Sequence, residues 1–101
     1  MTHKFPDDKQ KIAYVDFSNY KDRLLAIRYR KPQDVFQPLG FSGIIKLKKY
    51  LINKKIPKEK RYNLPMLCSG NEVLWMPGYA LSNNIKVLTK PTHVIEVKDK
   101  N

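Results

Sequence analysis

Only one segment of the chain has the length and periodicity of an α-helix, and this limits the fold more than any other feature. The segment follows Ser42, a good N-cap residue, and ends at Pro57, which cannot continue a helix. At about 100° per residue, Ile44, Leu47 and Leu51 fall on one face. The other apolar runs are short and rich in residues that favour strands. The sequence therefore predicts a single α+β domain with one main helix.

The expected strands lie on both sides of this helix, at residues 12–17, 24–30, 66–69, 72–76, 85–88 and 93–97. Gly70-Asn71 suits the two-residue loop of a hairpin, and Pro77-Gly78 turns the chain again. Residues 18–22 and 58–63 are expected to form short turns or single helical turns. Alternation along 24–30 places Arg28 and Arg30 on the same side of that strand.

Pro32 and Pro38 bracket a loop before the helix, and each disfavours a helical conformation in the residue that precedes it. The segment is therefore expected to be extended or turned. Asp34 is predicted to hydrogen-bond to its own backbone as an Asx turn. Phe36 and Leu39 are the expected anchors into the core.

A chain of 101 residues is long enough for one domain. Residues 1–11 are expected to be a flexible arm, 12–97 the folded domain, and 98–101 a polar tail. Neither a signal peptide nor an apolar run of membrane-spanning length is found, so a cytoplasmic protein is expected. The single cysteine, Cys68, lies in an apolar strand and is interpreted as a packed thiol in a reducing compartment.

The charge of the chain points to its partners. It has 20 basic and 9 acidic residues, a net charge of +11, and the basic residues are concentrated between Arg28 and Arg61. Such clustering favours nucleic acid as a partner, ahead of an anionic membrane surface or an acidic protein. A merely solvated basic surface remains the alternative.

The sequence offers little for catalysis. Its two histidines, His3 and His93, and its lone cysteine do not form a zinc ligand set, and no glycine-rich phosphate-binding loop occurs. No catalytic residue, metal ligand or cofactor is expected in this chain.

A series of motifs runs through the chain in a definite order and spacing. They comprise Arg28, Arg30, Pro32, Asp34, Phe36, Pro38, Leu39, Gly40, Lys46, Leu47, Lys48, Ile56, Pro57, Arg61, Pro65, Leu67, Trp75, Pro77, Gly78, Lys86 and Val87. In these the chain resembles the C-terminal domain of bacterial tRNA(Ile)-lysidine synthetase, over roughly 14–97. The chain departs from the family pattern at three positions. Gln33 stands in place of glycine, Val35 in place of arginine, and Ala80 where the family often has another arginine. The sequence does not predict the effect of these changes.

The resemblance implies a small β-sandwich of unusual topology, similar to a domain of the phenylalanyl-tRNA synthetase β subunit. It also implies contact with the acceptor stem of tRNA(Ile). The parent enzyme uses ATP to attach lysine to the wobble cytidine, in a catalytic domain whose Ser-Gly-Gly-x-Asp-Ser motif is absent from this sequence. The implied partners are tRNA(Ile) and that catalytic domain, and the chain is not expected to be an enzyme by itself.

The candidate RNA contacts are all basic: Arg28, Arg30, Lys46, Lys48, Lys49, Lys54, Lys55 and Arg61. The two arginines of the strand suit forked contacts to phosphate, and the lysines act as point charges. Lys48 and Lys55 fall within the apolar sector of the helix, so each either snorkels to water or is presented at a binding edge. Tyr50 and Tyr62 are candidates either for stacking on an end base or for packing.

A second function also fits the sequence. The apolar flank of the helix and Trp75 could serve a protein-interaction module that docks on the catalytic domain or forms a homodimer. Salt dependence separates the two functions, because counterion release makes RNA binding sensitive to salt and an apolar interface is not.

Overall fold

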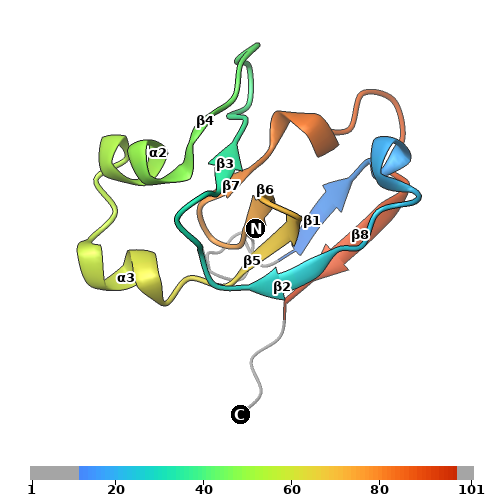
Figure 1. Cartoon of the computed structure of the whole chain (residues 1–101). Helices are drawn as coiled ribbons and strands as arrows, with labels where there is room; N and C mark the ends of the chain where they lie inside the picture. The colour runs from blue at the N-terminus through green and yellow to red at the C-terminus, as the bar shows by residue number, and fades with distance from the viewer. Residues whose placement is uncertain (1–11, 98–101) are drawn as a thin grey trace, which may run out of the picture.

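The computed structural model describes residues 12–97 and contains two sheets with two short helices (Figure 1). A two-stranded sheet pairs β1 with β8, and a larger sheet has the order β2-β5-β6-β3-β4, with β7 also paired to β6. The expected arm and tail lie outside the described residues. The elements are β1 (Ile12–Val15), η1 (Ser18–Tyr20), β2 (Ala26–Arg28), β3 (Val35–Phe36), β4 (Ile45–Lys46), α2 (Leu47–Asn53), α3 (Lys58–Tyr62), β5 (Met66–Ser69), β6 (Glu72–Met76), β7 (Ala80–Leu81), η2 (Asn83–Ile85) and β8 (His93–Glu96).

Strand β6 is the centre of the larger sheet. One of its edges pairs antiparallel with β5, and the other is shared by β3, which runs parallel to it, and β7, which runs antiparallel. The β5–β6 hairpin turns at Gly70-Asn71, as predicted, with Gly70 at a φ of +59° that glycine adopts readily. In β6, the residues Val73 to Met76 are all buried, as expected for a strand covered on both faces.

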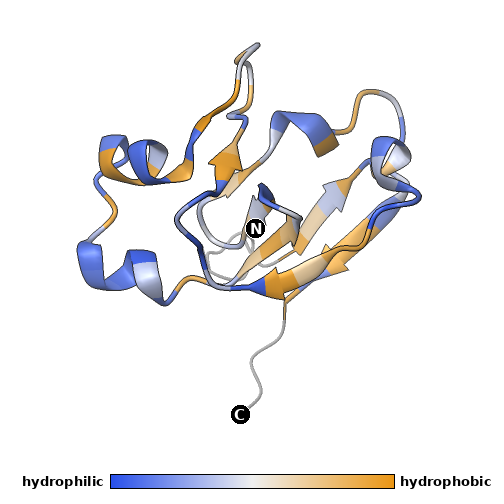
Figure 2. Ribbon diagram, viewed as in Figure 1, coloured by the Kyte–Doolittle hydropathy of each residue, from blue (hydrophilic) through white to orange (hydrophobic). Residues whose placement is uncertain are grey.

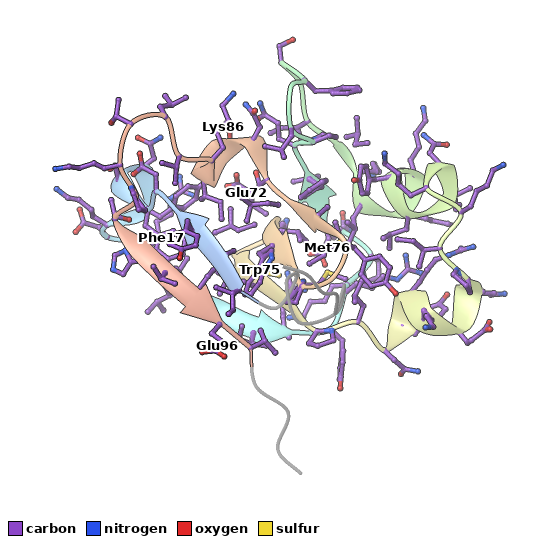
Figure 3. All side chains as sticks on the ribbon, turned by 180° about the vertical axis from the view of Figure 1, so that it is seen from behind. Phe17, Glu72, Trp75, Met76, Lys86 and Glu96 are labelled. Atoms are coloured by element: carbon purple, nitrogen blue, oxygen red, sulfur yellow. The ribbon has the colours of Figure 1, made fainter. Side chains whose placement is uncertain are left out.

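The side chains of β6 contribute to two cores. Val73 and Met76 pack in a cluster with residues of α2 and β3, whereas Leu74 packs with Val15 of β1 and Ile85 of η2. In Figure 3, seen from behind, Met76 lies on the side of the helices and Phe17 at the opposite end of the molecule. The larger sheet therefore lies between a helical layer and the β1–β8 ribbon, which confirms the α+β class.

The main helix begins later than the sequence predicts. Ser42 does not cap it: α2 starts at Leu47, and Ile45–Lys46 form β4, paired antiparallel with Val35–Phe36. The chain reverses in the loop that contains Gly40, whose φ is +80°, and then returns beside β3. Pairing with β3 therefore overrides the helical periodicity of this segment.

The consequences for the core are mixed. Phe36, Leu47 and Leu51 are buried, as predicted. Leu39 and Ile44 were expected inside and are instead 51% and 56% exposed, because both belong to the β3–β4 hairpin that extends away from the sheet (Figure 1).

Two predicted strands differ from the structure. Residues 85–88 form no strand, because the chain first makes the 3-10 turn η2, where the Ser82 hydroxyl accepts a hydrogen bond from the Asn84 backbone at 3.0 Å. The expected strand 24–30 is reduced to Ala26–Arg28, with Ile27 and Tyr29 exposed. The helical turn at α3 and the strands β1 and β8 occur where the sequence predicts them, to within two residues.

None of the helices within residues 12–97 is long and apolar enough to cross a membrane. In the same residues, no group of three His, Cys, Asp or Glu side chains is placed to hold a metal ion.

Cys68 is only 1% exposed in β5, and burial raises the pKa of its thiol from 9.0 to about 11. We expect alkylation by iodoacetamide at pH 8 to be slow in the folded protein and fast in urea, as followed by mass spectrometry. Because the unfolded chain releases this proton near pH 9, the folded state should lose stability as the pH rises from about 9 to 11. Cys68→Ala should lack this component of the pH dependence. Rapid labelling of the folded protein would show that β5 opens.

Candidate nucleic-acid interface

Arg28 leaves the end of β2 and is committed to contacts within the chain. Its guanidinium donates to both carboxylate oxygens of Asp34 at 2.9 and 2.7 Å, and to the backbone oxygens of Gly70 and Tyr29 at 2.8 and 2.9 Å. The Arg28 side chain is 18% exposed and that of Asp34 is fully buried. Arg28 thus joins β2 to the β5–β6 turn, and little of its donor capacity faces solvent.

Asp34 was predicted to form an Asx turn with its own backbone, and it too makes longer-range contacts within the chain. Instead of serving only a local turn, its carboxylate pairs with Arg28 and also accepts the Lys31 backbone N–H at 2.8 Å. Its backbone oxygen accepts the N–H of Leu47, the first residue of α2, at 3.0 Å. Asp34 therefore fixes the loop between β2 and β3 relative to the helix.

Arg30 has a different environment from Arg28. Its guanidinium lies over the ring of Tyr62 from α3, 4.5 Å from the ring centroid. Tyr62 is 54% exposed, so this aromatic is a surface residue and not part of the core. The Arg30 guanidinium lowers the pKa of the Tyr62 hydroxyl, and the charges of Lys58 and Lys48 act in the same direction. Four basic or aromatic side chains, from three separate segments, thus gather at one place.

These groups surround a hollow of about 350 Å³, here called the Arg30 hollow. It is lined by Arg30, Lys31, Pro32, Leu47, Lys48 and Tyr62. Three of these described residues are cations and none is a carboxylate, so the hollow presents a positive charge that no carboxylate in its lining compensates. Figure 2 shows the same concentration of hydrophilic residues in the loop after β2, in α3 and in part of α2.

The structure brings only some of the predicted residues together here. Arg30 and Lys48 line the hollow, and Lys48 is exposed at its edge beside the buried Leu47. Lys31 and Pro32 were not among the candidates. Lys31 could have been predicted from its position next to Arg30 in the sequence. The approach of Tyr62 to Arg30 could not, because it depends on how α3 packs.

The remaining candidates are dispersed. Lys46 is exposed in β4, and Lys49 is exposed on α2. Lys54 lies over the Tyr50 ring, 5.6 Å from the centroid, and lines a separate hollow with Lys55, whose φ is +58°. The Arg61 side chain donates to the Ile56 backbone oxygen at 2.9 Å.

Comparison with known proteins places this chain in a family. The model described as "TilS substrate C-terminal domain" matches residues 25–96, a range that contains the Arg30 hollow. The chain belongs to the TilS C-terminal domain family. It is 37% identical over 87 residues to the tRNA(Ile)-lysidine synthase of Clostridium tetani, covering 86% of this chain and 18% of that protein. For the enzyme of Clostridium perfringens the identity is 40% over 90 residues, covering 89% and 17%.

A solved TilS C-terminal domain has the same fold. Its crystal structure superposes with a TM-score of 0.62 at 21% identity, covering 98% of this chain and 78% of the other. The family resemblance and the fold class predicted from the sequence are therefore confirmed. This TilS C-terminal domain spans less than a fifth of the length of the two clostridial enzymes described above.

Proposed function

We propose that this domain is the part of a bacterial, cytoplasmic tRNA(Ile)-lysidine synthase that holds tRNA(Ile) by its acceptor stem. The attachment of lysine, which consumes ATP, takes place in a catalytic domain that this chain does not include. The observation that carries the proposal is the Arg30 hollow, with three cations and no carboxylate on its walls, in a chain of net charge +11.

The chemistry of duplex RNA suits this surface. An RNA stem offers phosphates and 2′-hydroxyl groups to a protein, while its base edges are largely hidden in a deep major groove. The exposed cations Lys31 and Lys48 would meet the backbone as point charges and position the RNA without reading its sequence. Arg30 adds a planar fork that matches phosphate. Arg28 would support this surface through Asp34 and not bind RNA itself.

Binding to tRNA(Ile) should be strongly salt-dependent. If about four phosphates are neutralised, the affinity should fall about a hundredfold between 50 and 200 mM salt, because the condensed counterions are released on binding. Fluorescence anisotropy with labelled tRNA measures this slope. Lys48→Leu should lower the affinity and reduce the slope by roughly one phosphate contact without loss of stability. If Lys49→Leu lowers the affinity equally, diffuse charge is responsible and not the Arg30 hollow.

One observation favours a second function, docking to another protein surface or to a second copy of the chain. The β3–β4 hairpin exposes Leu39, Phe41 and Ile44, of which Phe41 is 60% exposed. A complex made through this hairpin would persist in salt and be weakened by Phe41→Ala. Analytical ultracentrifugation at 50 and 500 mM salt distinguishes this behaviour from RNA binding.

A further inference from the structure

The walls of the Arg30 hollow are of two chemical kinds. Tyr62 and Pro32 supply aromatic and apolar surface, whereas Arg30, Lys31 and Lys48 supply positive charge. A binding site for phosphate alone needs only the charged half. An aromatic surface beside cations is the arrangement that proteins use for single-stranded nucleic acid, where bases stack and phosphates pair with basic groups.

The size of the hollow agrees with such a ligand. Its volume of about 350 Å³ lies at the lower end of the range for small-molecule sites. A paired stem can lie only across its rim, because the bases of a duplex are held in the helical stack. A nucleotide that is not paired can turn its base into the hollow.

The contact of Arg30 with Tyr62 prepares the site for a phosphate. Because the guanidinium lies over the ring, 4.5 Å from its centroid, the charge is held at the hollow before any ligand arrives. No carboxylate lines the hollow among the described residues, so the guanidinium remains available to an anion. Tyr62 remains more than half exposed despite this contact, which leaves ring surface for a base.

A second basic hollow at the other end of the molecule lacks these properties. It is lined by Phe17, Lys21 and Arg23, among others, and Arg23 also lies over a tyrosine ring, that of Tyr20, at 5.0 Å. However, Arg23 is paired with Glu72 at 3.6 Å, and Tyr20 is 6% exposed. The charge of Arg23 is therefore paired and the ring beneath it is covered, so Arg23 serves as a matched control for Arg30.

We propose that the Arg30 hollow binds one unpaired nucleotide of an RNA, with its base against Tyr62 and Pro32 and its phosphate held by Arg30, Lys31 and Lys48. This inference rests on the proposed RNA-binding function and deepens it. The domain would then recognise the single-stranded end of a stem in addition to the paired backbone.

The test compares a blunt-ended RNA duplex with the same duplex carrying a four-nucleotide 3′ overhang, at one fixed salt concentration. The overhang should increase the affinity by at least about fivefold, the lower bound for stacking one base. A 2-aminopurine base placed in the overhang should lose fluorescence on binding, because stacking quenches it. Tyr62→Ala should abolish the fluorescence change and the affinity gained from stacking, whereas Tyr62→Phe should retain both.

Variants of the two arginines complete the test. Arg30→Lys should weaken binding of the overhang RNA several-fold, and Arg23→Lys should not change it. If the overhang gives no advantage, or if Tyr62→Ala leaves that advantage intact, the nucleotide site is refuted while binding of the blunt duplex still supports the proposed function. If neither RNA binds at low salt, the proposed function itself is wrong. Circular dichroism of each variant verifies that the fold is retained.

Discussion

Asp34→Ala should destabilise the domain by about 3 kcal/mol, because it leaves the Arg28 guanidinium largely buried without its carboxylate partner. The substitution also removes the acceptor for the Lys31 backbone N–H. Urea unfolding monitored by the fluorescence of Trp75, which is 5% exposed, measures the change in free energy. Asp34→Asn should cost less, since an amide keeps the shape and one oxygen acceptor.

Asp22→Ala is the matched control, since Asp22 is an exposed carboxylate in the turn that precedes β2. It removes the same charge and should change the stability by less than about 0.5 kcal/mol. Asp34→Ala should also weaken RNA binding, because the loop that carries Arg30 and Lys31 loses its attachment. If Asp34→Ala were as stable as Asp22→Ala, the buried ion pair would not hold this loop.

Phe36→Ala should cost about 3–5 kcal/mol, the range for removing a large buried aromatic side chain. Phe36 has no exposed surface and packs against Tyr50, with ring centroids 4.8 Å apart. It also lies in β3, where it pairs with Val73 on one side and Ile45 on the other. The cavity would therefore weaken the contact between the larger sheet and α2.

The control for Phe36 lies five residues further along the chain. Phe41→Ala removes the same side chain from the exposed hairpin loop and should leave the midpoint of urea unfolding nearly unchanged. Equal losses from both variants would mean that the hairpin is packed in solution and that its apolar residues are not free for a partner.

The parts of the fold that sequence alone could predict are those decided by local interactions. Gly70-Asn71 between two apolar runs predicted the β5–β6 hairpin, because turn residues and flanking strands lie within eleven positions of one another. The start of α2 was predicted wrongly, because the segment Ile44 to Lys46 has helical periodicity and yet pairs with β3. That pairing depends on the parallel contact of β3 with β6, which no local pattern encodes.

The same limit applies to the candidate site. The clustering of charge identified Arg30 and Lys48 as candidate RNA contacts. The alternation along the strand predicted that Arg28 shares the environment of Arg30. The difference between the two arginines comes from the fold: one meets a buried carboxylate, and the other meets the ring of Tyr62 from a helix that follows much later. The role of each basic residue in RNA binding stays a prediction.

The pairing of β1 with β8 has a consequence for the way a cell makes this domain. The first described strand finds its partner only in the last, and the Phe17 backbone N–H bonds to a threonine hydroxyl 75 positions later. Contacts of such long range form slowly, since the intervening chain must be ordered before they are gained. On the ribosome, β1 must wait until β8 has emerged, so nascent chains carry an unpaired strand that favours aggregation at high rates of synthesis. Slower synthesis at lower temperature should therefore increase the yield of folded domain.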